Sequence, residues 1–413
     1  MTNFDVIESY AEDFTRLNYY EHRGTIDRTP NKIVITESKT DILNIIENIN
    51  TSTNDIVIKV TGVSEELKLF VQDINSVRQY ISKDGVYKFT NNVYRFFGFG
   101  INKVISGINV VIEQLPTSIL KDFSGNGNHA YLYGGKGKLN SGMGVYQQDF
   151  SKLIISRVDK KQDPFSFTVS GSGGSYLAYM QLGNWNNKAF KILANINAKG
   201  DYLYLRFRNS TDAVITSVML KNGENIIPAQ NIEGATKAVF EYSLKEGETI
   251  TITQIPDYPD SLCYDGKMYA VAYDMPILTD YTVMAERTWF EKEEYSAFIS
   301  NSLGGMEDPS NGAFSVELKS LNSFTAISFG SITSIGIPEK GITYQTKQSY
   351  NGNSINVGTK ESNDILILGG GYFYKNDNVV GNTWTGCHGA IIIADRSFTE
   401  EEINWLKQNW DKI

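Results

Sequence analysis

Residues 120–130 read Leu-Lys-Asp-Phe-Ser-Gly-Asn-Gly-Asn-His-Ala, and this stretch does most to decide the fold that the sequence predicts. An apolar segment is followed by a Gly/Asn-rich turn and then by a second β-prone segment. Glycine and asparagine tolerate positive φ, and the side chains of Asp122 and Ser124 can accept hydrogen bonds from the amides that follow them. We therefore expect a rigid loop between two strands.

The composition of the 413-residue chain favours antiparallel sheets, because it holds 24 Tyr and 21 Phe but only 9 Pro. The length predicts about two to four units. The formal net charge is −9 and no run of Lys and Arg is interleaved with aromatic residues, so we do not expect nucleic acid as a partner. Cys263 and Cys387 are too few for a disulfide framework and are expected to be small buried residues.

The N-terminal part shows a helical spacing of apolar residues. Phe4, Ile7, Ala11 and Phe14 lie three and four positions apart, and a second helical pattern covers 42–49. We expect residues 1–52 to form a helical region that either docks on another domain or gathers chains in an oligomer.

A period of two begins near residue 55 and predicts a small β module at 53–117. Its last strand ends in Gln-x-Pro at 114–116, and the segment 249–256 ends in the same way. Asp84-Gly85 and Asn222-Gly223 are matching hairpin signals. The interpretation is an internal repeat with copies at 53–117 and 161–259, and the alternative is that any two sandwiches share such strands.

The C-terminal segment predicts a docked helix. Thr399 and Glu402 have the spacing of a capping box, and Ile403, Leu406 and Trp410 form one apolar stripe.

The order Asp, one residue, Ser-Gly-Asn-Gly-Asn-His at 122–129 resembles the opening signature of laminin G-like (concanavalin A-like) jelly-roll domains. Two later segments resemble further landmarks of that family, in the right order. Residues 261–289 have an Asp-Gly strand end followed by Tyr-Thr-Val, and residues 389–403 have an Asp-Arg turn and a closing helix. The first gap is far longer than the family's, which indicates an insertion. We predict a mainly β chain with a discontinuous jelly roll at 118–160 and 260–413 and an inserted small β-sandwich module at 161–259.

The resemblance implies a function class but no single function, since such folds include glycan binders, calcium-dependent binders and glycosidases. Glycan binding needs aromatic planes flanked by polar groups, and the alternative for each ring is a place in the core. Two aromatic clusters among Gly and Asn are candidates: Tyr176, Tyr179 and Trp185 in the insertion, and Tyr372, Tyr374 and Trp384 near the end.

A calcium site is the candidate for a cofactor, and none other is expected. Oxygen atoms of Asp122, Asn126 and Asn128 could surround a cation, although no EF-hand spacing is present. The alternative is a loop held by its own hydrogen bonds. His388 beside Cys387 is expected to be a core or turn residue rather than part of a catalytic or metal site.

The sequence lacks the Glu-x-Asp-x-Glu array that a retaining glycosidase of this fold would be expected to place on one strand, so we expect no enzymatic activity. The chain also resembles head- or tail-appendage (fibre) proteins of crAss-like and related bacteriophages of gut bacteria. That resemblance implies a structural virion protein that attaches to a host surface glycan, contacts other virion proteins and forms a homo-oligomer, with a trimer favoured. The resemblance also implies a virion location. The sequence shows no signal peptide or transmembrane segment, so we expect no membrane contact. The alternatives are a polysaccharide depolymerase whose carboxylates come from separate strands and a bacterial surface adhesin.

Overall fold

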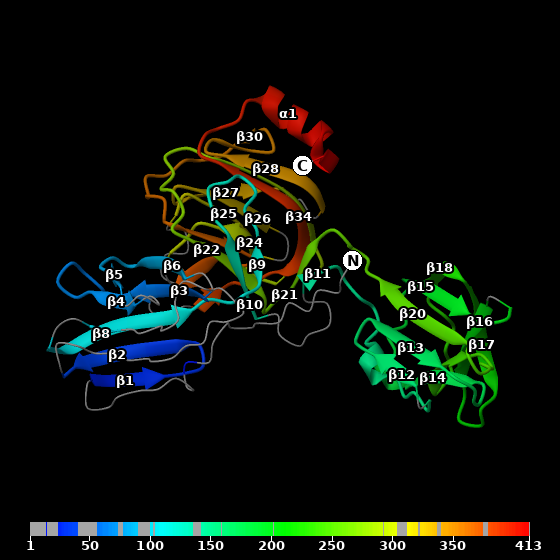
Figure 1. Ribbon diagram of the computed structural model, residues 1–413. Helices are drawn as coiled ribbons and strands as arrows, with labels where there is room; N and C mark the ends of the chain where they lie inside the picture. The colour runs from blue at the N-terminus through cyan, green and yellow to red at the C-terminus, as the bar shows by residue number, and fades with distance from the viewer. Residues whose placement is uncertain are drawn as a thin grey trace. The chain divides into compact units, whose positions relative to one another are not determined.

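The computed structural model is mainly β, in several antiparallel sheets, as the sequence predicted (Figure 1). It describes residues 14, 24–39, 56–72, 77–89, 100–101, 104–134, 142–157, 159–200, 202–291, 293–303, 312–320, 323–336, 340–374 and 379–412. Across these residues no helix is long and apolar enough to cross a membrane. The chain forms two compact units, one built mainly from Gly137–Asp265 and the other mainly from Val6–Lys136 and Gly266–Thr385.

The first unit contains a small sandwich of two antiparallel sheets. One sheet has the order β12(Lys160–Gln162), β13(Ser166–Ser170), β20(Thr249–Ile255), β15(Phe190–Asn197) and β18(Gly223–Ile227). The other has the order β14(Tyr176–Gln181), β19(Lys237–Glu241), β16(Tyr202–Arg208) and β17(Val214–Lys221).

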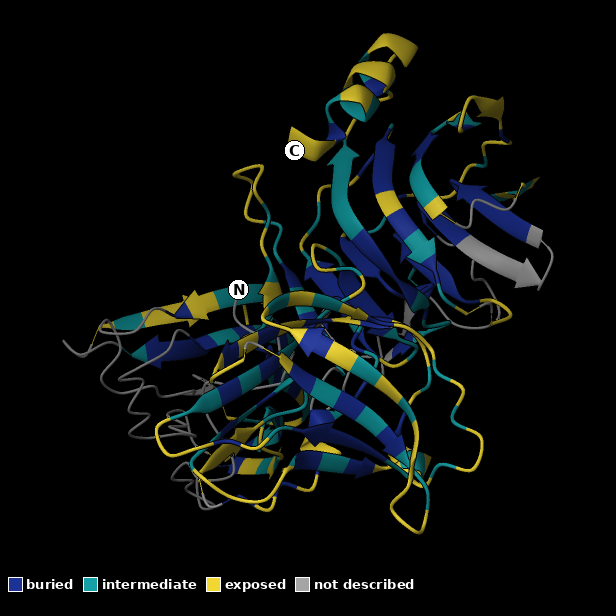
Figure 2. Cartoon of the chain, turned by 90° about the vertical axis from the view of Figure 1, so that its right-hand side faces the viewer, coloured by how far each residue is buried: buried dark blue, intermediate teal, exposed yellow. Residues whose placement is uncertain are grey.

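Alternating side chains build the core between these two sheets. In β15 every second residue is buried, because successive strand residues point to opposite faces, and Figure 2 shows such buried and exposed bands along strands. The Phe167 and Phe240 rings, one from each sheet, lie 5.1 Å apart. Phe150, Leu153 and Ile155 belong to the same core. The predicted start of the inserted module at residue 161 is therefore too late.

The second unit begins with another two-sheet module. Its larger sheet has the order β1(Gly24–Arg28), β2(Lys32–Ser38), β8(Ile105–Gln114), β3(Ile56–Thr61) and β6(Gly85–Phe89), and its smaller sheet has β5(Arg78–Ile81), β4(Leu69–Gln72) and β7(Gly100–Ile101). In chain order, β1, β2, β3, β4, β5, β6, β7 and β8 occupy the same sheet positions as β12, β13, β15, β16, β17, β18, β19 and β20. This agreement fits the internal repeat that the sequence indicates.

Two sequence predictions for this module need correction. Residues 1–52 were expected to be helical, but 24–28 and 32–38 are strands of the module, because β-branched residues alternate there and Ile33 and Ile35 enter its core. The predicted helices at 2–18 and 42–49 lie outside the described residues except for Phe14, which is buried in the same core. Asp84-Gly85 and Asn222-Gly223 were expected to close hairpins, but each joins strands of different sheets.

The rest of the second unit is a jelly-roll-like sandwich. One sheet runs β27(Ser331–Ile335), β26(Ser323–Ser328), β25(Phe314–Ser320), β24(Ala297–Ser300), β31(Ile365–Leu368), β22(Tyr269–Tyr273), β10(Ala130–Tyr133) and β9(Ile119–Leu120). In the facing sheet β34(Thr385–Ala394) neighbours β23(Thr282–Trp289), and β28(Lys340–Thr346), β29(Ser349–Tyr350) and β30(Asn353–Ser354) follow. β34 has residues in both units, and in the first unit it neighbours β21(Leu262–Asp265), which pairs with β11(Gly142–Met143).

The sequence landmarks take the expected local forms. The 122–129 loop joins β9 and β10, which pair antiparallel. The closing helix is α1(Glu400–Gln408), and Thr399 and Glu402 make both hydrogen bonds of the capping box. Ile403 is buried against the sandwich, and Trp410 is buried in a 3-10 turn after the helix.

Candidate functional site

Three of the six candidate aromatic residues are core residues rather than exposed planes. Trp384 is completely buried against Phe298, with ring centroids 5.0 Å apart. Trp185 is 8% exposed and packs edge-on against Phe207 in the core of the small sandwich. Tyr372 is also buried, and nothing about the Tyr374 side chain is described. Tyr372 and Trp384 of the cluster predicted near the C-terminus are thus not exposed planes, because aromatic side chains in sandwiches gain most by packing between the sheets.

The other two candidates, Tyr176 and Tyr179, are half-buried on the outward side of β14. We define the polar face as the outward side chains of β14, β19, β16 and β17 together with Asp212 in the β16–β17 turn. Along β16 the inward residues Leu203, Leu205 and Phe207 are fully buried. The outward residues of that strand are Tyr202, Tyr204, Arg206 and Arg208.

Strand register aligns polar and aromatic residues across this face. Tyr204 pairs with Glu241, which pairs with Tyr176 on the next strand. Directly opposed side chains in antiparallel strands lie close enough to interact. The face is therefore one continuous surface of four strands rather than a set of separate residues.

Glu241 is the centre of an ion-pair network. Only 5% of Glu241 is exposed. Arg206 donates from Nη1 to Glu241 Oε2 at 2.6 Å. Arg208 donates from Nε to Glu241 Oε1 at 2.5 Å and from Nη2 to Oε2 at 3.0 Å. The hydrogen bonds to Glu241 raise the pKa of Arg208. A bidentate guanidinium and carboxylate pair of this kind is a strong, directional contact, so the network fixes both arginine side chains over the sheet.

A second network begins at Tyr176. Its hydroxyl donates to Asp212 Oδ2 at 2.5 Å, and Lys237 Nζ lies 2.7 Å from Asp212 Oδ1. Desolvation, assisted by the hydrogen bond to Asp212, raises the pKa of Tyr176 to about 12. The hydrogen bonds from Lys237 and then Tyr176 lower the pKa of Asp212. Asp212 is therefore a carboxylate at neutral pH.

Aromatic rings remain accessible beside these charges. Tyr202 is 40% exposed, and its ring lies edge-on to Tyr204 at 5.6 Å and to Tyr242 at 6.3 Å. The Arg206 guanidinium carbon lies 4.6 Å from the centroid of the Tyr204 ring, which is cation–π geometry. Along the outward side of β16 two rings are thus followed by two fixed guanidinium groups.

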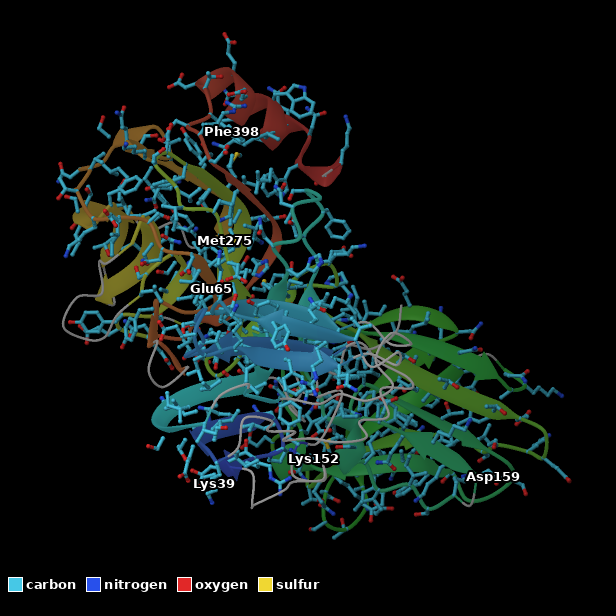
Figure 3. The ribbon with its side chains drawn as sticks, turned by 60° about the vertical axis from the view of Figure 1, so that its left-hand side comes forward. Lys39, Glu65, Lys152, Asp159, Met275 and Phe398 are labelled. Atoms are coloured by element: carbon cyan, nitrogen blue, oxygen red, sulfur yellow. The ribbon has the colours of Figure 1, made fainter. Side chains whose placement is uncertain are left out.

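A hollow of about 760 Å³ adjoins Tyr176. Buried Arg157 shapes it by donating from Nη1 to the Gly171 carbonyl at 2.7 Å and from Nη2 to the Gly174 carbonyl at 2.6 Å. A Cβ atom on Gly173 would come within 2.6 Å of Arg157 Nη1, so a larger residue there would displace the guanidinium. The other lining residues are Ser156, Asp159, Ser170, Ser172, Ser175 and Glu246. Figure 3 labels Asp159 among the green strands.

The loop that carries the candidate calcium ligands is held by its own hydrogen bonds. Asp122 Oδ1 accepts from the Ser124 amide at 2.8 Å, and Oδ2 accepts from the Asn128 amide at 2.9 Å. Burial opposes ionisation of Asp122, but hydrogen bonds from Ser124 and Asn128 outweigh it and lower its pKa. Asn126 is exposed, and its amide donates to Ser124 Oγ. The alternative that the sequence left open, a self-bonded turn, accounts for these contacts.

Cys263, Cys387 and His388 are buried, as expected. The His388 ring Nε2 lies 2.9 Å from the Tyr264 hydroxyl and Nδ1 lies 2.8 Å from the Gly389 carbonyl. This geometry fits a neutral imidazole that donates from Nδ1 and accepts at Nε2. Burial lowers the pKa of His388 to about 4.

Sequence reasoning missed most of the polar face. Arg206, Arg208 and the two Tyr residues before them alternate with apolar residues in 202–208, and this pattern was a readable signal of an outward polar row. Glu241 and Asp212, which bind Arg206, Arg208 and Tyr176, lie outside 202–208, so no local motif predicts these contacts.

Comparisons with known proteins identify no family. No family model matches the chain, and no curated protein matches it. The N-terminal CBM22-1-CBM22-2 tandem domain from Paenibacillus barcinonensis Xyn10C is similar at 10% sequence identity, over 60% of this chain and 98% of that chain, with a TM-score of 0.19. A chain of the lipid-containing bacteriophage PM2 is similar at 7% identity, over 88% of this chain and 96% of its own length, with a TM-score of 0.13. Neither similarity carries an inference about function.

Proposed function

We propose that the chain is a non-enzymatic glycan-binding protein and that the polar face is its binding surface. The observation that carries this proposal is the row of Tyr202, Tyr204 and Arg206 along β16, with Glu241 holding the arginine in place. Sugar rings present apolar faces that stack on aromatic side chains, and their hydroxyl groups need directional hydrogen-bond partners. An open sheet face with both kinds of group suits an extended glycan.

The same contacts favour binding over hydrolysis. A glycosidase needs one carboxyl group that stays protonated as a general acid and a second carboxylate beside it. On the polar face Glu241 is paired with two arginines, and the pKa of Asp212 is lowered. These carboxylates suit the fixing of side chains, and a depolymerase remains the alternative to be tested by release of reducing sugar.

The biological setting of this binding is a proposal from the sequence resemblance. We propose that the chain forms part of a virion appendage, a head or tail fibre, in which an oligomer of the chain binds a host surface glycan. Mass spectrometry and electron microscopy of purified particles would test it, and absence of the chain from particles would favour the adhesin alternative.

Affinity electrophoresis of the full chain in gels that contain candidate polysaccharides tests the binding. We expect Tyr202→Ala and Tyr204→Ala each to weaken retardation, with Kd rising about tenfold, as for an aromatic hot-spot residue. Leu193→Ala is the matched control, since Leu193 is exposed on β15 in the opposite sheet of the same sandwich. If both Tyr variants bind as tightly as the unmodified chain and keep its melting temperature, the polar face is not the binding surface.

A further inference from the structure

We infer that the polar face selects polysaccharides that carry negative charges, as carboxylate or sulfate groups. This inference rests on the proposed function and adds the chemical class of the ligand. The face carries four cations and two carboxylates: Arg206, Arg208, Lys221, Lys237, Glu241 and Asp212. A net positive surface on a chain whose formal net charge is −9 is a local departure from the charge of the whole, and it matches an anionic ligand.

Two of the four cations are available to a ligand. Arg206 makes a hydrogen bond to Glu241 through Nη1, and its side chain is 31% exposed. A guanidinium has five N–H donors in a planar fork that fits carboxylate and sulfate oxygens, so Arg206 keeps donors for a ligand. Lys221 is exposed, and its ammonium pairs with no carboxylate within the described residues.

The spacing of these two cations indicates a polymer rather than a small anion. Arg206 lies opposite Ser217, and Tyr202 lies opposite Lys221, four positions further along β17. At the usual rise per strand residue this separation is about 13 Å, which one carboxylate or sulfate group cannot bridge. Tyr204, opposite Met219, lies between these two positions, and Tyr202 lies beside Lys221. Both rings offer apolar surface to the sugars of a chain that spans the two cations.

The hollow beside Tyr176 has a different character. Asp159 and Glu246 line it, and the Arg157 guanidinium donates to two loop carbonyls. An anionic group is therefore expected over β16 and β17, whereas uncharged sugar hydroxyls suit the hollow.

The test uses biolayer interferometry of the full chain on immobilised polygalacturonate, dextran sulfate, uncharged dextran and poly(dT). We expect polygalacturonate, dextran sulfate or both to bind at least about tenfold more tightly than dextran, because a charge-assisted hydrogen bond contributes about 1.5–3 kcal/mol. The better of the two anionic polymers identifies the group as carboxylate or sulfate. Raising NaCl from about 0.05 to about 0.5 M is expected to weaken this binding, since salt screens exposed charges.

Matched variants locate the effect. We expect Arg206→Gln and Lys221→Gln each to weaken anionic binding about tenfold, and Arg206→Lys to recover part of the loss. Lys191→Gln removes the same charge from exposed β15 in the opposite sheet and is expected to change nothing.

Each other outcome has a defined meaning. Salt-independent binding of dextran as tight as that of the anionic polymers overturns charge selection and leaves glycan binding standing. Equal losses from Lys191→Gln and Arg206→Gln overturn the placement on this face. Binding of poly(dT) as tight as that of the anionic sugars overturns the assignment to a glycan. If none of the polysaccharides binds, glycan binding fails as well.

Discussion

Lowering the pH is expected to destabilise the fold through His388. The buried imidazole has a pKa of about 4, against 6.5 for the ordinary side chain. The unfolded chain therefore binds a proton between these two values while the folded chain does not, so stability is fully present above pH 6.5 and falls as the pH drops towards 4. At 1.36 kcal/mol per pKa unit, the loss from His388 alone is about 3 kcal/mol at the lower end of this range.

The assay compares urea unfolding of the unmodified chain and His388→Gln, followed by tryptophan fluorescence across this pH range. Glutamine does not titrate, and its Oε1 can accept the hydrogen bond from Tyr264. We expect the unmodified chain to lose about 3 kcal/mol more than the variant on acidification. A difference in unfolding free energy that stays constant with pH would show that His388 does not destabilise the fold on acidification, and so would an NMR titration that places the His388 pKa near 6.5.

Three further predictions concern local features. Thr399→Ala removes the side chain that accepts from the Glu402 amide and should lower the free energy of unfolding by about 1 kcal/mol in calorimetry. Thr399→Ser should keep the stability of the unmodified chain. An unchanged free energy of unfolding in Thr399→Ala would contradict a stabilising capping box. Cys263 and Cys387 are buried and form no disulfide, and the contact between them and their burial raise the pKa of Cys263. Ellman's reagent should therefore label two thiols per chain only after unfolding, and rapid labelling of the folded chain would contradict this. Calcium added to chelator-treated protein should leave the melting temperature unchanged, because both Asp122 carboxylate oxygens already accept amide hydrogens, and a rise would revive the metal site.

The features that sequence predicted best depend on contacts between near neighbours. The loop at Asp122 and the capping box of Thr399 and Glu402 consist of side chains that bond to amides a few residues away, so the pattern contains nearly all of the physics. The period of two that begins near residue 55 was equally direct, because a half-buried strand repeats every two residues.

The features that sequence missed depend on which sheet receives each strand. A Gly-containing turn such as Asn222-Gly223 has the same local chemistry whether the next strand pairs back or crosses to the facing sheet, and here it crosses. Trp185 and Trp384 sit among Gly and Asn in sequence, yet their rings enter cores built from distant strands. The polar face likewise needs Glu241 and Asp212 to meet Arg208 and Tyr176, and only the folded sheet brings them together.

Glycan binding by the polar face is tested most directly by a crystal structure of the full chain with an oligosaccharide of the polymer that it binds most tightly. We predict sugar rings over Tyr202 and Tyr204, with a sugar oxygen within hydrogen-bond distance of Arg206. An oligosaccharide bound elsewhere, with the polar face free of ligand, would contradict it.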